Sequence, residues 1–320
     1  MRALLFASLL LMAAAPAQAQ NYPTRPITMV VPFAAGGPTD TVARVTAEQM
    51  SRLLGQSVVV ENVSGAGGTI GSHRVVRAEP DGYTILLNHL GLATAVSLYR
   101  KLPFDPIADL KPIGVVSDAN MVIIARPGYG PSTLAELIAD AKARGEQVSF
   151  AHSGLGAASQ LCGMLFLATI EKQLTQVPFR GGGPVIQALL GNQVDLGCEQ
   201  ATTAAPQVQA GSLKSYAVTS ARRLSSMPNV PTVVEAGLPG LEISVWHGLY
   251  VPAKTPDAVA QKLTKALADA LRDPALVKRF EDISTIPTPE KATPDILSQT
   301  LKSEIERWRP LITAAGQYAD

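Results

Sequence analysis

The stretch Ile27–Asp40, ITMVVPFAAGGPTD, decides the fold of this chain, because it reads as a buried strand that leads through a glycine turn into a helix. Residues 27–31 are apolar apart from Thr28, and most of them are β-branched, as in a buried strand. Pro32 ends the strand, because proline has no N–H to donate to a neighbouring strand.

The second half of this stretch predicts a helix N-terminus that could bind an anion. Gly36 and Gly37 can adopt backbone angles that other residues avoid, and Pro38 is favoured at the first position of a helix. We expect Thr39 or Asp40 to cap the helix with its side chain, and we favour this role over that of a general base because caps are common at such positions. Free N–H groups here, with the helix dipole behind them, would suit a carboxylate or a phosphate.

The same pattern recurs along the chain and predicts an α/β fold of mostly parallel sheets flanked by helices. A strand at 57–61 leads into the glycine-rich turn 62–71, and a strand at 148–151 leads into residues 152–160, which open another helix. Further strands are expected at 83–87, 121–125, 176–179, 195–198, 213–219 and 243–251, and further helices at 133–143, 256–272, 274–282 and 294–317. Residues 65–71 do not give the spacing G-x-G-x-x-G, so we interpret them as a tight packing turn.

The N-terminus predicts export. Residues 1–19, MRALLFASLLLMAAAPAQA, contain one basic residue, an apolar run and Ala17-Gln18-Ala19 in the A-x-A pattern of a cleavage site, so we expect cleavage after Ala19. The apolar run is shorter than the roughly 20 residues that a membrane span needs. Removing Arg2 leaves 26 basic residues, which balance the 26 acidic ones. This balance argues against a nucleic-acid partner or a polybasic membrane patch.

The sequence offers little for catalysis or for metal binding. It contains neither a G-x-S-x-G nucleophile turn nor a G-x-x-x-x-G-K-[ST] phosphate loop. The four histidines never occur at the spacing of a metal-ligand pair, so we expect no metal and no cofactor. His152 beside Ser153 suggests a base and a nucleophile, but neighbours in an extended segment point to opposite faces.

A series of motifs runs through the whole mature chain and resembles one known family. The motifs are Phe33-x-x-Gly36-Gly37-x-Thr39-Asp40, Glu61-Asn62-x-x-Gly65-Ala66-Gly67-Gly68, Pro80-Asp81-Gly82-Tyr83-Thr84, Leu102-Pro103-Phe104-Asp105-Pro106, Gly182-x-Pro184, Gln193-Val194-Asp195 and Pro228-x-Val230-Pro231-Thr232-x-x-Glu235-Ala236-Gly237. Together they resemble the Bug family, also called TctC, the periplasmic solute-binding proteins of tripartite tricarboxylate transporters.

The resemblance implies a two-lobe periplasmic binding protein, or Venus flytrap, in which each lobe is a mostly parallel sheet flanked by helices. Lobe 1 would comprise residues 20–125 and 245–320, and lobe 2 residues 126–244, with crossing strands at 125–127 and 246–248. It also implies a small organic acid as ligand, gripped by backbone amides and small hydroxyls of two glycine loops, and delivery to the membrane permease subunits. We expect a monomer that does not itself span the membrane.

Carried over by position, the resemblance places the first-lobe grip at Phe33–Asp40 and the second-lobe grip at Ser153–Gln160. The expected ligand-binding residues are Phe33, Ala34, Gly36, Gly37, Thr39, Asp40, Asn88, His89, Ser153, Gly154, Gly156, Ala157, Ala158, Ser159, Gln160, Arg180 and Glu199. Gln160 stands where the family commonly has histidine. Asn88 and His89 either shape the far side of the pocket or form a strand-end turn. Arg180 and Glu199 either contact the ligand at second-lobe strand ends or lie on an ordinary surface.

Cys162 and Cys198 are the only cysteines in a chain that we expect in an oxidising compartment. Both fall in the expected second lobe, one at a helix start and one at a strand end, and we predict a disulfide between them. Two buried free thiols are the alternative.

Two other functions remain beside carboxylate transport. A ligand-binding component that signals to a membrane sensor would have the same cleft. An exported α/β hydrolase-type enzyme is less favoured, because it would need a titratable pair on one side of the cleft.

Overall fold

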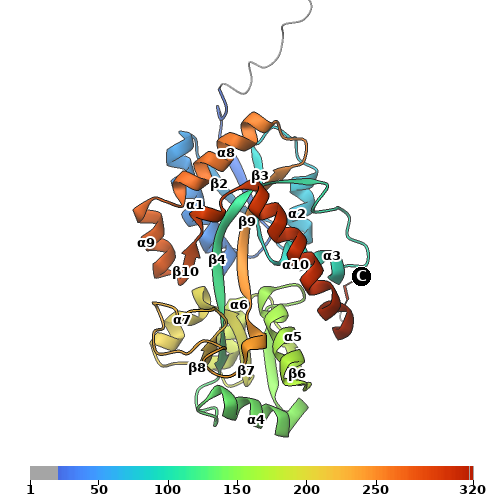
Figure 1. The fold of residues 1–320 in the computed structure, drawn as a ribbon, viewed down its shortest axis with the longest axis vertical. Helices are drawn as coiled ribbons and strands as arrows, with labels where there is room; N and C mark the ends of the chain where they lie inside the picture. Colours follow the sequence, from blue (N-terminus) through green and yellow to red (C-terminus); the bar gives the residue numbers. More distant parts are fainter. Residues whose placement is uncertain (1–20, 317, 320) are drawn as a thin grey trace, which may run out of the picture.

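Two lobes joined by long strands make up the protein (Figure 1). The computed structural model describes residues 21–316 and 318–319, so the expected signal peptide lies outside the described residues. The joining strands are β4 (Leu110–Ala125), which has 16 residues, and β9 (Ser244–Pro252). One mixed sheet continues through both lobes in the order β2 (Val58–Asn62), β1 (Ile27–Val31), β3 (Thr84–His89), β9, β4, β7 (Leu196–Gln200), β5 (Ser149–His152) and β6 (Thr175–Pro178). The strands β8 (Lys214–Val218) and β10 (Thr285–Pro287) also pair with β4.

The first lobe is built around β1, which pairs in parallel with β2 on one side and β3 on the other. β9 then pairs antiparallel with β3 and with β4. The other elements of this lobe are α1 (Pro38–Leu54), α2 (Thr69–Val76), α3 (Gly91–Leu98), α8 (Asp257–Ala270), α9 (Pro274–Asp282) and α10 (Pro294–Ala315), with strands β1 (Ile27–Val31), β2 (Val58–Asn62), β3 (Thr84–His89) and β10 (Thr285–Pro287).

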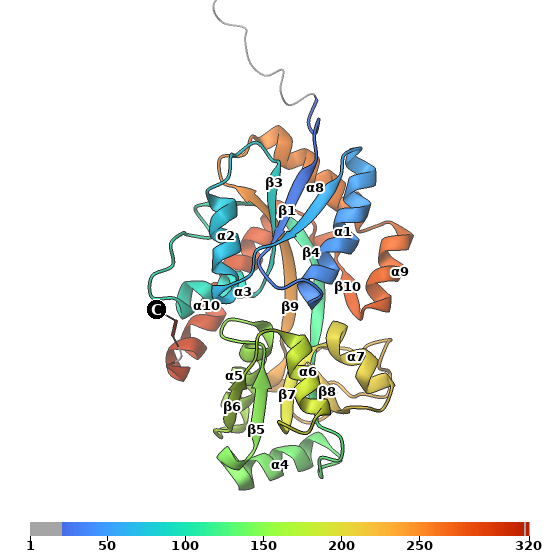
Figure 2. The same cartoon turned by 180° about the vertical axis from the view of Figure 1, so that it is seen from behind.

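The second lobe repeats the parallel arrangement around β5, which pairs with β6 and β7. Figure 2 shows the helices of this lobe around its strands. They are α4 (Leu134–Arg144), α5 (Ala158–Ile170), α6 (Gly182–Leu190) and α7 (Ala201–Gln209), and the strands are β5 (Ser149–His152), β6 (Thr175–Pro178), β7 (Leu196–Gln200) and β8 (Lys214–Val218). The outer strands are therefore parallel, as expected, whereas the central ones are antiparallel.

Alternation along the strands sorts the apolar side chains between two faces of the sheet. In β1, Met29 and Val31 join the core beneath α1, α8 and α9, whereas Val30 joins the core beneath α2, α3 and α10. In β4, Val122 packs beneath α6 and α7, whereas Ile123 faces α5. Because both faces are buried, these strands read in the sequence as continuous apolar, β-branched runs, and that is the signal that predicted them.

Strand pairing places the crossing between the lobes at Asn120 and Met121. Residues up to Asn120 pair with β9, and Met121–Ala125 pair with β7 and β8 of the second lobe. The family resemblance had instead implied that 121–125 belong to the first lobe, with a crossing at 125–127. The difference arises because β4 is one continuous strand, whose last residues belong to the second sheet. On the return, β9 is paired with β4 from Ser244 onward, so its crossing lies just before the expected residues 246–248.

Within the described residues, none of the helices combines the length and the apolar character that crossing a membrane requires.

Candidate functional site

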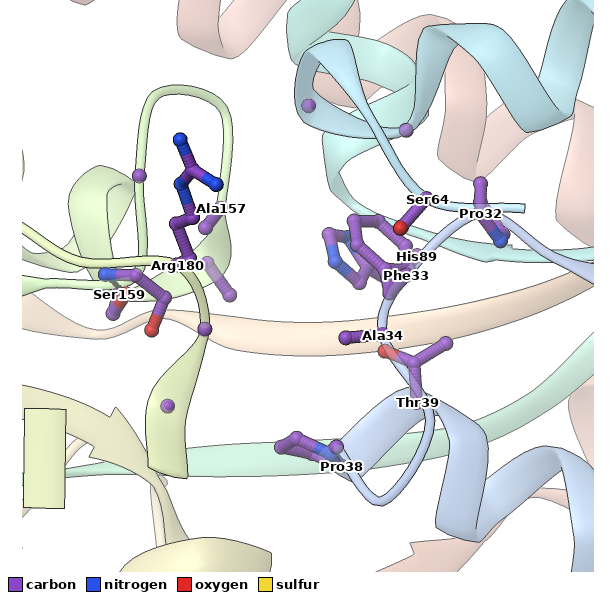
Figure 3. Close-up of a pocket in the computed structure, with 18 of the residues that line it drawn as sticks. Pro32, Phe33, Ala34, Pro38, Thr39, Ser64, His89, Ala157, Ser159 and Arg180 are labelled. Atoms are coloured by element: carbon purple, nitrogen blue, oxygen red, sulfur yellow. Dashed lines mark hydrogen bonds between the residues drawn. The ribbon is translucent and has the colours of Figure 1, made fainter. Parts of the chain in front are cut away.

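A cleft of about 630 Å³ lies between the two lobes. Its first-lobe wall carries Phe33, Thr39 and His89, and its second-lobe wall carries Ala157, Ser159 and Arg180, as Figure 3 shows. The full lining is Pro32, Phe33, Ala34, Gly37, Pro38, Thr39, Ser64, Gly65, Ala66, Gly67, Gly68, His89, Tyr99, Ser153, Gly154, Leu155, Ala157, Ala158, Ser159, Phe179, Arg180, Gly181, Gly182, Glu199 and Gln200. The helix N-termini of α1 and α5 therefore reach the cleft from opposite lobes.

At the first-lobe turn, the side chain of Asp40 accepts hydrogen bonds that stabilise the loop before α1, and Asp40 is not the N-cap of the helix. The N-cap is Gly37, without a side-chain cap, and Asp40 lies in the first turn. Its Oδ2 accepts hydrogen bonds from the Gly36 N–H at 2.8 Å and from Arg44 Nε at 2.9 Å, and its Oδ1 accepts one from Asn62 Nδ2 at 2.9 Å. Burial alone would raise the pKa of Asp40, but these hydrogen bonds outweigh it and hold the pKa below its ordinary value. Gly36 and Asp40 thus brace the turn and do not line the cleft.

Thr39 lines the cleft and is linked to the joining strands through a buried histidine. Its Oγ1 lies 3.3 Å from Nε2 of His247 on β9, and Nδ1 of His247 lies 3.2 Å from Oγ of Ser117 on β4. Burial, and the neighbouring His89, keep the pKa of His247 well below its ordinary value, so the ring is neutral. This polar chain connects the start of α1 to both strands that join the lobes.

Phe33 and His89 form an aromatic wall. Their rings stack at 4.2 Å between centroids with an angle of 13°. Burial lowers the pKa of His89 to about 3, and its Nδ1 accepts a hydrogen bond from the Gly91 N–H. Asn88 does not line the cleft; its side chain donates to Ser72 Oγ and accepts from the His89 N–H, which is the role of a strand-end turn.

The second glycine loop of the first lobe also faces the cleft. Residues Ser64–Gly68 line it, although the sequence analysis interpreted 65–71 only as a packing turn. Gly67 has a φ of +59°, and a Cβ there would lie 2.8 Å from Tyr99 Oη and 3.0 Å from the carbonyl oxygen of Leu155 in the second lobe. A sequence signal for this loop was available, because 27–40 and 57–71 both read as a strand that leads through a glycine turn into a helix. Such units form neighbouring parallel strands, as β1 and β2 do, and their following turns reach the same edge of the sheet.

The second-lobe turn has the same bracing as the first. The Gly156 N–H donates to Gln160 Oε1 at 3.3 Å, four residues further on, as the Gly36 N–H donates to Asp40. Both braced glycines have positive φ, +77° at Gly36 and +78° at Gly156. Gly156 and Gln160 lie outside the cleft lining, whereas Ala157, Ala158 and Ser159 at the start of α5 lie within it.

Arg180 and Glu199 give the second-lobe wall its charged groups. Arg180 is exposed, reaches into the cleft in Figure 3 and has no hydrogen-bond or ion-pair partner among the described residues. Glu199 is 2% exposed at the end of β7 and accepts a hydrogen bond from Ser153 Oγ at 2.8 Å. Burial raises the pKa of Glu199 to about 7, although hydrogen bonds from Ser153 and Ser159 lower it in part.

A disulfide lies directly behind this wall. Cys162 on α5 and Cys198 on β7 are bonded, with Cα atoms 6.1 Å apart. The bond ties the helix that starts at the cleft to the strand that carries Glu199.

The arrangement does not form a catalytic or metal centre. His152 Nδ1 accepts from the Gly154 N–H, whereas Ser153 donates to Glu199, so the two neighbours have different partners. No three His, Cys, Asp or Glu side chains in the described part of the chain gather as a metal site would require.

The fold and the cleft define a two-lobe ligand-binding protein. The family model for the tripartite tricarboxylate transporter family receptor, TctC, matches residues 42–317, and the chain belongs to this family. It is a binding protein and not an enzyme, like the family members of known structure.

Several solved structures match the fold over nearly the whole chain. The periplasmic binding protein BugD is 44% identical, with a TM-score of 0.88 over 93% of this chain and 100% of its own. MatC from Rhodopseudomonas palustris, solved with bound malate, is 38% identical, with a TM-score of 0.85 over 91% of this chain and 100% of its own. Rpa4515 from R. palustris, solved with adipate, is 30% identical, with a TM-score of 0.87 over 92% of this chain and 99% of its own.

Proposed function

We propose that the protein captures an organic carboxylate in the cleft between its lobes, in the periplasm, and delivers it to the membrane permease of a tripartite tricarboxylate transporter. The observation that supports this most is the approach of two helix N-termini, those of α1 and α5, to one cleft from opposite lobes.

The chemistry of the cleft suits an acid. The first N–H groups of a helix have no carbonyl partner within their own helix, and the helix dipole adds a partial positive charge at the same end. Arg180, which has no hydrogen-bond or ion-pair partner among the described residues, adds a donor on the second-lobe wall, and Thr39 adds a hydroxyl on the first-lobe wall. The neutral rings of Phe33 and His89 would cover an aliphatic chain between the donors.

The similar proteins that were solved with a bound ligand support the same class of ligand, small carboxylates. Malate and adipate, bound by MatC and Rpa4515, are both small dicarboxylates. Export to the periplasm and docking to a permease rest on the family and on the leader sequence, residues 1–19.

A thermal-shift screen of mono-, di- and tricarboxylates, amino acids and aromatic acids tests the proposal. Micromolar binding corresponds to about 8 kcal/mol, and an excess of ligand would raise the melting temperature measurably. Arg180→Gln should reduce the shift, whereas Arg222→Gln, which removes a positive charge outside the cleft lining, should not. The absence of any shift across the panel, confirmed by calorimetry, would contradict carboxylate capture.

A further inference from the structure

The carboxyl group of Glu199 lies among the second-lobe residues that were expected to bind the ligand, so it affects which chemical groups a ligand needs in order to bind there. The hydroxyl of Ser153 donates to Glu199 Oε1, and Ser159 also hydrogen-bonds to this carboxyl group. Ser159 Oγ additionally accepts the Ser153 N–H at 2.7 Å. These two small hydroxyls, which the family resemblance assigned to the grip on a ligand carboxylate, are therefore engaged by a carboxyl group of the protein itself.

Glu199 is not paired with a cation among the described residues, although Arg180 lines the same wall. The Glu199 side chain is almost fully buried and lines the cleft. On the neighbouring helix α6, Gly182 leaves the room that Glu199 needs, since a Cβ there would lie 2.7 Å from Glu199 Oε2. An ionised carboxylate in such a place needs donors, and the cleft is the open side from which a further donor can come.

A second acceptor lies beside it in the same wall. Gln200 is 6% exposed and lines the cleft, and its buried Oε1 has no hydrogen-bond donor among the described residues. Buried polar atoms are normally hydrogen-bonded, so we expect this oxygen to accept a hydrogen bond when a donor is present. The second-lobe wall therefore carries an acceptor, Glu199, beside the amides at the start of α5.

We infer that Glu199 is a specificity-determining residue, which selects carboxylate ligands that carry a hydrogen-bond donor, a hydroxyl or an ammonium group, toward the second lobe. The inference rests on the proposed function and adds the class of acid to it. The ligand carboxylate lies at the donors of α1 and Arg180, and its hydroxyl or ammonium group donates to Glu199, with Gln200 beside it. A second full carboxylate placed against an ionised Glu199 would be repelled.

Matched acids test this directly. Calorimetric titrations at about pH 8, where most Glu199 is ionised, compare succinate, malate and aspartate, and then glutarate, 2-hydroxyglutarate and glutamate. In the unmodified protein, the hydroxy or amino acid should bind at least about tenfold more tightly than the unsubstituted acid of the same length.

Two variants of Glu199 distinguish recognition of an ammonium group from recognition of a hydroxyl group. Glu199→Gln removes the charge and keeps an acceptor, so it should abolish a preference for an ammonium group and retain a preference for a hydroxyl group. Glu199→Met removes both the charge and the acceptor, so it should abolish either preference. Glu235→Gln, which removes an exposed acid paired with Arg223 outside the cleft lining, is the control and should leave the preference unchanged. Circular dichroism confirms that each variant is folded.

The outcomes distinguish this inference from the proposed function. Equal binding of substituted and unsubstituted acids at both lengths, or a preference that survives in Glu199→Met, overturns the inference and leaves carboxylate capture standing. If no acid of either set binds and the wider acid panel gives no shift, carboxylate capture fails and the inference fails with it.

Discussion

The backbone N–H of Gly156 donates to the side chain of Gln160 in the same way that the N–H of Gly36 donates to Asp40. In each lobe, a glycine of positive φ is tied to the third residue of the helix that starts at the cleft. The hydrogen bond occupies the glycine amide and fixes the loop, so the amides that remain for a ligand are those at the helix start itself. The two lobes thus present the same device from opposite sides.

The first prediction concerns this brace. Asp40→Asn should weaken ligand binding and lower the free energy of unfolding by roughly 1 to 3 kcal/mol, because hydrogen bonds from Gly36 and Arg44 to a carboxylate become bonds to a neutral amide. Glu48→Gln on the same helix is the control, since its exposed ion pairs with Arg52 and Arg279 are each worth at most about 1 kcal/mol. Denaturant unfolding and calorimetry measure both quantities. Equal effects of the two substitutions would show that the brace has no special role.

The second prediction concerns the disulfide. Protein that is denatured without reductant should show no free thiol, and reduction should lower stability by roughly 3 to 4 kcal/mol, because the bond closes a loop with a sequence separation of 36. A thiol assay and denaturant unfolding of the Cys162→Ala, Cys198→Ala double variant provide the measurements. Two thiols titrating in the unreduced denatured protein would rule the bond out.

The third prediction concerns movement of the lobes. Bending at Asn120 and Met121 on β4 and just before Ser244 on β9 would bring the lobes together around a ligand, since pairing changes partner there. Solution scattering should give a smaller radius of gyration with saturating ligand than without it. Superimposable curves would indicate that ligand binds without closure.

The elements that the sequence predicted well are those whose pattern is local. The strand at β1 and the helix Pro274–Asp282 follow from β-branched residues and from a proline start. By contrast, α3 is apolar on most of its sides and gives no amphipathic signal, and the first half of β4 is interrupted by Pro112 and Gly114. Neither element was expected.

For the site, the two turns could be predicted, but the partners of their residues could not. Asp40 binds Asn62 from a strand that follows, and Gly67 approaches Leu155 from the other lobe, so both contacts depend on tertiary arrangement. Nothing local in the sequence shows that Ser153 and Ser159 are engaged by Glu199.

The fourth prediction concerns pH and stability. The pKa of Glu199 is raised from 4.5 to about 7, so the folded protein holds this proton more tightly than the unfolded chain does. The stabilising effect is complete below the unfolded pKa and is lost as pH rises through about 7. Glu199→Gln should therefore gain stability relative to the unmodified protein as pH rises, by about 3 kcal/mol between acid and mildly alkaline pH. Chemical denaturation of both proteins across this range measures the difference, in which the effects of the buried histidines cancel. A difference that stays constant with pH would show that Glu199 titrates normally.

The last prediction concerns the source of affinity. If amides at the two helix starts hold the carboxylate, each charge-assisted bond supplies roughly 1.5 to 3 kcal/mol, so a few account for micromolar binding. Gly36→Val and Gly156→Val should abolish binding, because valine disfavours a φ near +77° and the loop that sets the amides must move. Arg180→Ala should weaken binding only modestly, since its guanidinium is exposed and screened.

Hydroxyl variants complete this ranking. Thr39→Ala should fall between the glycine and arginine variants, because it removes one hydroxyl of the cleft and leaves the backbone donors in place. Ser159→Ala should also be intermediate, because it removes the hydroxyl that accepts the Ser153 N–H and so loosens the second-lobe turn while the amides remain. Calorimetry with the acid found by thermal shift gives the order, after circular dichroism has confirmed folding. Loss of all binding in Arg180→Ala together with retention in Gly36→Val would mean that a cationic side chain, and not the backbone at the helix starts, holds the ligand.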